Sequence, residues 1–198
     1  MLLTLIRHGE VNGRKQVLRG RTDDVLSDYG YQQMRDIITT IQPDVTAIAT
    51  SPLKRCNDFA SSLSAERQLP LHVMNELREI DFGEWENMTL AEAEAHDPRC
   101  FHTFKHDTAH WQPPSGEPYS ALRERVRQAL TQIIELKSPH VLAVTHGGVI
   151  RAMLAECLEM TPASAARIGV PLAGLCQLWI DDDGKGSLLR LQWIERPC

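Results

Sequence analysis

The chain has 198 residues and a mass of 22.3 kDa, and 42% of its residues are apolar and 24% charged, which suits one globular domain spanning residues 1–198. Its net charge of −5 argues against binding to nucleic acid or to an anionic membrane. Apolar runs reach only strand length, and the first run meets Arg7 too early for a signal peptide or a membrane span. We therefore expect a cytoplasmic protein.

The cysteines are odd in number, widely spaced and without a Cys-x-x-Cys pair. This pattern predicts reduced thiols rather than a disulfide framework. They are Cys56, Cys100, Cys157, Cys176 and Cys198. Cys56 falls near the cationic residues described below and could react there, but a packing role in a helix is the expectation.

Apolar spacing and turn signals divide the first 80 residues into strands and helices that alternate, as in a parallel sheet. The strands are expected at residues 2–6, 45–50 and 69–73, and the helices at residues 28–41 and from Ser51 to about residue 65. Ser27 can cap the first helix and Pro43 closes it. In the second helix Ser51 is expected to cap, with Pro52 at the first helical position.

Residues 81–118 differ in character and are expected to form a lid-like insertion or substrate wall rather than core. The stretch is rich in histidine, tryptophan and proline, and only residues 90–95 have a helical pattern. His102, His106 and His110 are four residues apart, so a helix would align them as candidate zinc ligands. No second metal motif or cysteine pair accompanies them, which makes zinc the weaker alternative.

The rest of the chain is predicted to continue the alternation and to end in a hairpin. Helices are expected at residues 119–137, at 148–158 and just after Thr161-Pro162, and strands at 140–145, 174–180 and 187–194. The link at residues 181–186 is of the hairpin type. Together the elements predict an α/β fold with a mostly parallel sheet, an antiparallel edge strand, and helices on both faces.

Three predicted strands end in cationic or imidazole side chains. The first runs into Arg7-His8-Gly9, the second into Ser51-Pro52-Leu53-Lys54-Arg55, and the strand at residues 140–145 into His146-Gly147-Gly148. Parallel strands end at the same edge of a sheet, so we expect these groups to share one anion-binding pocket.

A phosphate monoester suits the chemistry of such a pocket. Arg7 and Arg55 would bind the non-bridging oxygens with their forked guanidinium groups. The Gly147 backbone N–H and that of the next glycine, at the mouth of a helix, would add a neutral anion site. His8 and His146 are the candidate nucleophile and its partner, because a neutral imidazole can attack phosphorus without a separate base.

The leaving oxygen of a monoester needs a proton donor, and Glu79 is the candidate acid. The residues that follow it, 81–85, are tightly spaced and partly apolar, which could keep a carboxyl group protonated near neutrality. Glu76, Asp81 and Glu84 lie beside it in the sequence and are alternatives.

Four segments resemble, in order and spacing, the histidine phosphatase (phosphoglycerate mutase-like) superfamily. They are Leu5-Ile6-Arg7-His8-Gly9-Glu10, Ser51-Pro52-Leu53-Lys54-Arg55, Leu77-Arg78-Glu79 with Phe82-Gly83, and Thr145-His146-Gly147-Gly148. The resemblance covers essentially the whole chain. It implies a three-layer α/β/α sandwich that needs no metal or other cofactor, in which His8 becomes phosphorylated. It also implies that Arg7, Arg55 and His146 form the phosphate pocket and that Glu79 donates the proton.

One position departs from the pattern of the superfamily. Members often carry an asparagine seven residues after the motif arginine, where this chain has Arg14 in a loop that is one residue shorter. Asn12 or Arg14 could take over that contact with phosphate, or the role could be empty.

Within the superfamily the short chain resembles phosphatases more than mutases, which carry an extra segment that closes over a bisphosphate. Residues 78–86, Trp111 and residues 114–117 are similar to the α-ribazole-5′-phosphate phosphatases of cobalamin nucleotide-loop assembly. The resemblance implies a small phosphorylated metabolite as partner and leaves the oligomeric state open. A flat heterocycle would suit an aromatic wall. The candidates for that wall are Trp85, Phe101, Phe104 and Trp111.

Three alternatives accompany this interpretation. A broad-specificity sugar or nucleotide phosphatase and a phosphoglycerate mutase-like enzyme would use the same pocket. A non-catalytic module that binds a phosphorylated ligand would keep Arg7 and Arg55 but would not need His8, Glu79 and His146 together, so their joint presence argues against it.

Overall fold

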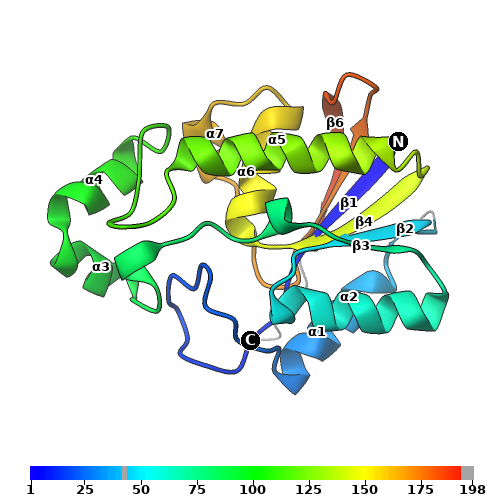
Figure 1. Ribbon diagram of the computed structural model, residues 1–198, viewed down its shortest axis with the longest axis horizontal. Helices are drawn as coiled ribbons and strands as arrows, with labels where there is room; N and C mark the ends of the chain where they lie inside the picture. Colours follow the sequence, from blue (N-terminus) through cyan, green and yellow to red (C-terminus); the bar gives the residue numbers. More distant parts are fainter. Residues whose placement is uncertain (42–43, 193–198) are drawn as a thin grey trace.

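The computed structural model describes residues 1–41 and 44–192, and within these ranges six strands form one sheet in the order β3-β2-β4-β1-β5-β6 (Figure 1). The strands are β1 (Leu2–Arg7), β2 (Ala47–Thr50), β3 (Leu71–Val73), β4 (His140–Thr145), β5 (Leu175–Ile180) and β6 (Gly186–Gln192). The first four run parallel to one another, whereas β5 pairs antiparallel with both β1 and β6. The predicted mostly parallel sheet with antiparallel pairing at one edge is confirmed.

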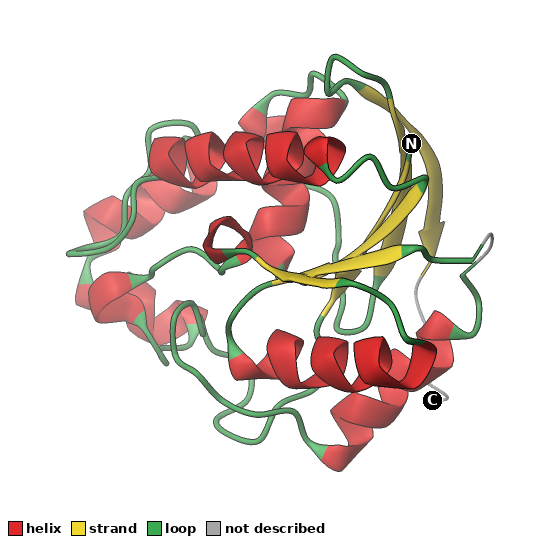
Figure 2. Cartoon of the chain, turned by 45° about the vertical axis from the view of Figure 1, so that its right-hand side comes forward, coloured by secondary structure: helices red, strands yellow, loops and turns green. Residues whose placement is uncertain are grey.

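Helices cover both faces of the sheet, as Figure 2 shows. The helices of the described ranges are α1 (Asp28–Ile38), α2 (Lys54–Arg67), α3 (Leu90–His96), α4 (Pro98–His106), α5 (Tyr119–Glu135), α6 (Gly147–Cys157) and α7 (Pro162–Ala166), with 3-10 turns η1 (Asn75–Leu77) and η2 (Gly83–Trp85). None of them combines the length and the apolar character that crossing a membrane requires.

The alternation of side chains along the strands explains the three layers. On β1, Leu3 and Leu5 join the core cluster that contains α5 and α6, whereas Ile6 joins the cluster that contains α1 and α2. On β4, Ala143 and Val144 divide in the same way. Successive side chains of a strand point to opposite faces, so a strand that is apolar at every position must be covered on both sides. The α/β/α sandwich implied by the resemblance follows directly.

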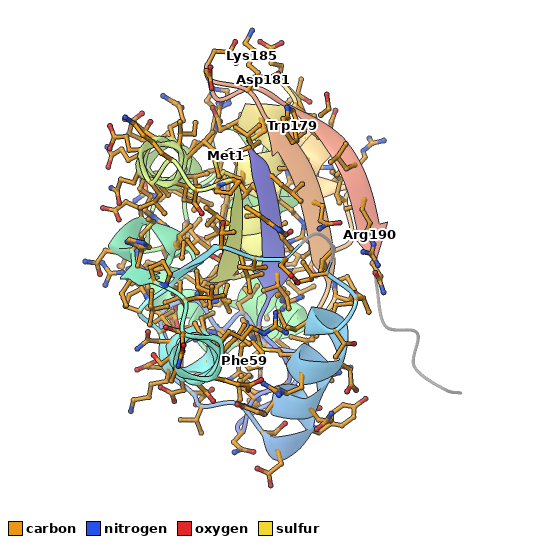
Figure 3. All side chains as sticks on the ribbon, turned by 90° about the vertical axis from the view of Figure 1, so that its right-hand side faces the viewer. Met1, Phe59, Trp179, Asp181, Lys185 and Arg190 are labelled. Carbon is orange, nitrogen blue, oxygen red and sulfur yellow. The ribbon has the colours of Figure 1, made fainter. Side chains whose placement is uncertain are left out.

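The edge formed by β5 and β6 is less covered than the centre of the sheet. Figure 3 shows Trp179 on β5 and Arg190 on β6 at this edge, and it labels Phe59 of α2, which belongs to the core cluster that contains α1 and α2. Trp179 is 49% exposed, whereas Phe59 is fully buried. The N-terminal amino group of Met1 donates to the carbonyl of Ile180, 2.7 Å away, and so fixes the start of β1 beside the end of β5.

Local signals in the sequence predict one helix start correctly and another wrongly. The hydroxyl of Ser27 accepts a hydrogen bond from the Gly30 N–H at 3.0 Å, as expected for the cap of α1. The prediction that Ser51 caps the second helix is wrong, because α2 begins at Lys54 after Leu53. The Ser51 hydroxyl accepts from the Leu53 N–H at 3.3 Å, just before the helix, and lies 2.8 Å from Nε2 of His146.

Several predicted boundaries also differ from those of the structure. The first helix ends at Ile38 rather than at residue 41, and the next strand begins at Ala47 rather than at residue 45. Pro43, the predicted end of the first helix, and Ile194, the predicted end of the last strand, lie outside the described residues. Helix ends set by weak apolar spacing are the least certain part of such predictions.

Residues 81–118 contain one helix more than the sequence pattern predicted. In addition to α3, the segment Pro98–His106 forms α4, in which the Asp97 carboxylate accepts from the Cys100 N–H at 3.0 Å and proline occupies the first turn. The sequence contains this capping signal, Asp97 followed by Pro98, but the helix that it starts has only nine residues. Because α4 ends at His106, the expectation that one helix aligns three histidines is wrong, and His110 pairs with Asp107 at 2.9 Å.

Candidate active site

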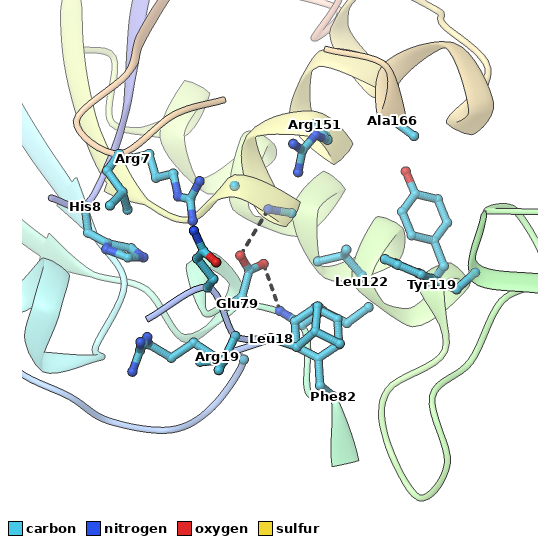
Figure 4. Close-up of a pocket in the computed structure, with 18 of the residues that line it drawn as sticks. Arg7, His8, Leu18, Arg19, Glu79, Phe82, Tyr119, Leu122, Arg151 and Ala166 are labelled. Atoms are coloured by element: carbon cyan, nitrogen blue, oxygen red, sulfur yellow. Dashed lines mark hydrogen bonds between the residues drawn. The ribbon is translucent and has the colours of Figure 1, made fainter. Parts of the chain in front are cut away.

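A cavity of about 760 Å³ lies at the carboxyl ends of the parallel strands. The register pairs Arg7 of β1 with Thr145 of β4, and Thr50 of β2 with Val144, so the residues after these strands meet at one edge. Small-molecule sites typically have volumes of about 300–1,000 Å³, and in parallel sheets they lie at this edge. Figure 4 shows His8 and Arg7 at one end of the cavity, Glu79 in the middle, and Tyr119, Leu122 and Phe82 at the other end.

His8 is held in the tautomer that a nucleophile needs. Its Nδ1 lies 2.8 Å from the carbonyl oxygen of Gly9. A carbonyl only accepts hydrogen bonds, so Nδ1 carries the hydrogen and Nε2 keeps its lone pair. His8 is 5% exposed and lines the cavity. Burial, followed by the positive charges of Arg7 and Arg55, lowers the pKa of His8 well below its ordinary value, so the ring is neutral.

The Arg7 guanidinium lies beside the start of α6 and retains an unused donor. Its Nη1 donates to the Val170 carbonyl at 2.7 Å, whereas Nε is buried and has no hydrogen-bond partner within the described ranges. A β-carbon built on Gly147 would lie 3.6 Å from Arg7 Nε, so the guanidinium and the backbone of the helix start are neighbours. A buried donor without a partner is costly, which favours a bound oxyanion at this position.

Arg55 is fully buried, and its orientation is fixed on three sides. Nη1 donates to the Thr22 carbonyl at 2.6 Å, Nη2 to the Gly20 carbonyl at 2.7 Å, and Nε to Nδ1 of His146 at 3.2 Å. Because carbonyls take one hydrogen of each terminal amino group, a second hydrogen remains on each for a ligand in the cavity that Arg55 lines.

His146 lies directly behind this surface. Its ring centroid is 5.3 Å from that of His8. His146 is fully buried and is not among the described residues that line the cavity. Nδ1 accepts from Arg55, so in the neutral ring Nε2 carries the hydrogen and faces the hydroxyl of Ser51. Burial, followed by the charge of Arg55, lowers the pKa of His146 well below its ordinary value. Its expected contact with a phosphoryl group stays a prediction.

Glu79 reaches the cavity from the segment that follows β3. Oε1 accepts from the Ile80 N–H at 3.0 Å, and Oε2 accepts from the Gly148 N–H at 3.1 Å, as the dashed lines of Figure 4 show. The Gly148 N–H, expected to bind the anion directly, therefore holds the carboxyl group instead. The alternative acids Glu76 and Glu84 do not line the cavity.

A half-buried ion pair between Arg125 and Glu117 positions the segment that carries Glu79. Arg125 of α5 donates through Nη1 to the carbonyls of Glu76 and Arg78, at 2.7 and 2.5 Å, and pairs through Nε and Nη2 with Glu117, at 2.6 and 2.9 Å. Glu117 also accepts from the Asp81 N–H at 3.2 Å, so this bidentate ion pair holds the backbone on both sides of Glu79.

Cys56 of α2 has the packing role that was expected. Its sulfur lies 3.6 Å from Nε2 of His146, and the side chain is fully buried. Burial raises the pKa of this thiol, so it does not ionise near neutrality. The described cysteines, which exclude Cys198, are all free thiols.

Four cations of the cavity wall were missed from the sequence: Lys15, Arg19, Lys105 and Arg151. Arg151 lies one turn along α6 from Gly147, a spacing from which its position could have been foreseen. Arg19 lies in a loop of irregular structure and pairs with Asp24, and no pattern predicts it. Asn12 and Arg14 do not line the cavity, and Arg14 pairs with Glu92 at 2.6 Å.

The aromatic wall differs in part from the expectation. Phe104 and Trp111 line the cavity, with ring centroids 4.7 Å apart, and Phe82 joins them. Trp85 and Phe101 are buried behind this layer and pack against it, so their assignment to the wall is wrong. The reason is that η2 turns Trp85 toward the core of the insertion, where it stacks on Trp111.

Groups of three or more histidine, cysteine or acidic side chains that could hold a metal do not occur within residues 1–41 and 44–192. His102 and His106 contact each other on the exposed side of α4, with ring centroids 4.5 Å apart, and His110 lies beyond the end of that helix. The residues proposed for zinc thus do not converge on one point.

Comparisons with known proteins agree with this geometry. A model of the histidine phosphatase superfamily (branch 1) matches residues 3–193. The chain is 29% identical over 168 residues to the adenosylcobalamin/alpha-ribazole phosphatase of Escherichia coli K12, covering 83% of this chain and 82% of that protein. It is 30% identical over 184 residues to the glucosyl-3-phosphoglycerate phosphatase of Mycobacterium tuberculosis, covering 84% and 79%.

The solved structures show the same likeness. The crystal structure of a putative alpha-ribazole-5'-P phosphatase from Escherichia coli superposes with a TM-score of 0.85 at 25% identity, covering 98% of this chain and 96% of the other. The first curated relatives are longer: the chain spans 52% of a bifunctional protein of Mycobacterium tuberculosis, to which it is 30% identical over 190 residues. The expected enzyme class, a phosphoric monoester hydrolase, agrees with this family and with the phosphatase names of these relatives. Because the family model matches residues 3–193, nearly the whole chain, the chain belongs to branch 1 of the histidine phosphatase superfamily.

Proposed function

We propose that the protein hydrolyses phosphate monoesters of small metabolites through a phosphohistidine formed on His8. The carrying observation is the tautomer of His8, whose Nδ1 hydrogen is donated to the Gly9 carbonyl while Nε2 keeps its lone pair at the cavity wall. The lone pair forms the N–P bond as the ester P–O bond breaks, and the leaving oxygen takes a proton from Glu79. Water then attacks phosphorus, returns a proton to Glu79, and releases phosphate and neutral His8.

The cations of the cavity would hold the transferred group during both steps. Arg7 offers its unpartnered Nε, and Arg55 the free hydrogens of its terminal amino groups. In this proposal Gly147 adds its backbone N–H, and His146 keeps Arg55 aimed and lies against His8. Fixed donors around a developing charge are the main source of rate acceleration in such sites.

For the substrate, we propose α-ribazole 5′-phosphate. The ring faces of Phe82, Phe104 and Trp111 in the cavity wall suit a benzimidazole, and a relative at 29% identity bears that activity in its name. The free thiols of the described cysteines support a reducing compartment, so we place the enzyme in the cytoplasm.

A phosphorylated sugar or sugar acid is the second candidate. It is favoured by Arg151, whose Nε donates to the Ile168 carbonyl at 2.9 Å while its terminal amino groups remain available to the cavity. A forked guanidinium there would bind a carboxylate or sugar hydroxyls on the leaving group. A relative at 30% identity is a glucosyl-3-phosphoglycerate phosphatase by name.

Two measurements test the proposal. His8→Ala should reduce turnover of p-nitrophenyl phosphate below detection and abolish an acid-labile phosphoenzyme, whereas His102→Ala, on the exposed side of α4, should retain both. Activity of His8→Ala at the normal rate would refute the nucleophile. Specificity constants for α-ribazole 5′-phosphate and glucosyl-3-phosphoglycerate then decide the substrate, and a ratio above about 100-fold for either settles the choice.

A further inference from the structure

The carboxylate of Glu86, just after η2, joins two segments that lie far apart in the sequence. Oε1 accepts from the N–H groups of Phe82, at 3.0 Å, and Arg21, at 2.8 Å. Oε2 accepts from the N–H and the hydroxyl of Thr22, at 2.9 and 2.7 Å. Four donors around one carboxylate, three of them backbone amides, make a strong, directional set of charge-assisted hydrogen bonds.

The loop that Glu86 holds is the same loop that aims Arg55. The carbonyls of Gly20 and Thr22 accept from the two terminal amino groups of Arg55, at 2.7 and 2.6 Å. Among the ion pairs of the described residues none includes Arg55, so carbonyls rather than a carboxylate fix its guanidinium. An uncharged partner holds the arginine in place without neutralising the charge that a phosphoryl group needs.

Close packing leaves the loop little freedom. Gly20 has φ +48°, and a β-carbon built on it would overlap Oε1 of Glu86, so this position favours glycine both for its conformation and for its contact with the carboxylate. Glu86 itself is half-buried and does not line the cavity. Glu86 therefore reaches the phosphate site through the loop and Arg55, and it reaches the aromatic wall through the N–H of Phe82.

We infer that Glu86 is a positioning residue for phosphoryl binding: it holds residues 20–22, whose carbonyls aim the Arg55 guanidinium into the cavity. The inference rests on the proposed function, because it assumes that Arg55 binds the phosphoryl group. It also connects the start of the 81–118 insertion to the phosphate site, since the Phe82 N–H shares the carboxylate with the loop. A misplacement of about 1 Å in such a group can reduce the rate by about 100-fold.

The test is a double-mutant cycle of Glu86→Gln and Arg55→Lys, read as the specificity constant for p-nitrophenyl phosphate and the inhibition constant of vanadate. The amide of glutamine places an N–H against the loop amides and keeps the size of the side chain. Glu86→Gln alone should lower the specificity constant and weaken vanadate binding by about 10- to 100-fold. In the Arg55→Lys background the same change should add less than about threefold, because the group that it aims is gone.

Control variants keep the result interpretable. Glu84→Gln, two residues away and exposed, should leave both constants unchanged. Thr22→Val removes one donor to Glu86 and serves as a milder second variant if Glu86→Gln does not fold, with an expected loss of about threefold.

Three outcomes would overturn the inference. If Glu86→Gln lowers the specificity constant equally in the wild-type and Arg55→Lys backgrounds, Glu86 does not act through Arg55. If vanadate binding is unchanged in Glu86→Gln or Thr22→Val, the loop is not needed to orient the Arg55 guanidinium. Normal constants for Arg55→Lys would refute the phosphate site of the proposed function itself, and the inference with it.

Discussion

The two buried histidines of the site should make folding stability depend on pH, and His146→Gln isolates one of them. Burial and Arg55 lower the pKa of His146 well below its value in the unfolded chain, which is about 6.5. Below that pH the unfolded state takes up a proton that the folded state does not, so the free energy of unfolding falls as the pH falls, until the folded pKa is reached. The same holds for His8.

The size of the effect follows from proton counting. One proton taken up on unfolding changes the free energy of unfolding by about 1.4 kcal/mol per pH unit, so His8 and His146 together contribute about 2.7 kcal/mol per unit below pH 6.5. Glutamine can accept from Arg55 and donate to Ser51 but cannot titrate. His146→Gln should therefore have a lower free energy of unfolding than the wild type near pH 7.5. The difference between the two proteins should shrink by about 1.4 kcal/mol for each pH unit below 6.5.

Urea unfolding at several pH values between about 5.5 and 7.5 measures the gap, because groups common to both proteins cancel in the difference. Cys56→Ala is the matched control: it removes a buried neighbour of His146 that does not ionise in this range, so its deficit should be constant with pH. A gap between wild type and His146→Gln that is the same at both ends of the range would refute the conclusion that His146 is buried in the neutral form.

Three further results are expected. Gly30→Ala should lower the free energy of unfolding by about 2–3 kcal/mol, because the new β-carbon would overlap the backbone carbonyl of Glu10. The control Gly169→Ala places its β-carbon in open space and should leave the stability unchanged. Equal melting temperatures of the two variants would contradict this. Arg125→Gln should lower kcat about tenfold with little change in KM by releasing the Glu79 loop, while exposed Arg127→Gln should not; a pure KM effect would argue against this role of the ion pair. EDTA should leave hydrolysis of p-nitrophenyl phosphate unchanged, and a loss restored by zinc would reinstate the metal alternative.

Local sequence signals account for much of the fold. The strand at residues 140–145 was predicted with its exact bounds, and Ser27 and Thr161 cap helices where their side chains face free N–H groups. Ser51 shows the limit of such signals: its hydroxyl accepts from the Leu53 N–H and contacts His146, a residue nearly a hundred positions away, and α2 begins only at Lys54. A capping preference is worth only about 1 kcal/mol, so a buried tertiary contact overrides it.

The candidate site likewise depends partly on local sequence and partly on tertiary contacts. His8, Arg7, Arg55 and Glu79 were predicted because each follows a recognisable apolar strand or motif, and all of them line one cavity. The sequence did not predict Phe82 in the wall, nor that Trp85 turns inward, because a single 3-10 turn decides which ring faces the cavity.

By itself the sequence determined the order of strands and helices, the chemical groups at the strand ends and the family to which the chain belongs. Only the tertiary structure decided which donors stay free for a ligand. The Gly148 N–H is taken by Glu79 and the His146 nitrogens by Arg55 and Ser51. Each terminal amino group of Arg55 gives one hydrogen to a carbonyl of the loop that Glu86 holds and keeps the other for a ligand. Periodicity and motifs act over a few neighbouring residues, whereas the partner of a buried polar group is set by contacts between segments that the chain order does not specify.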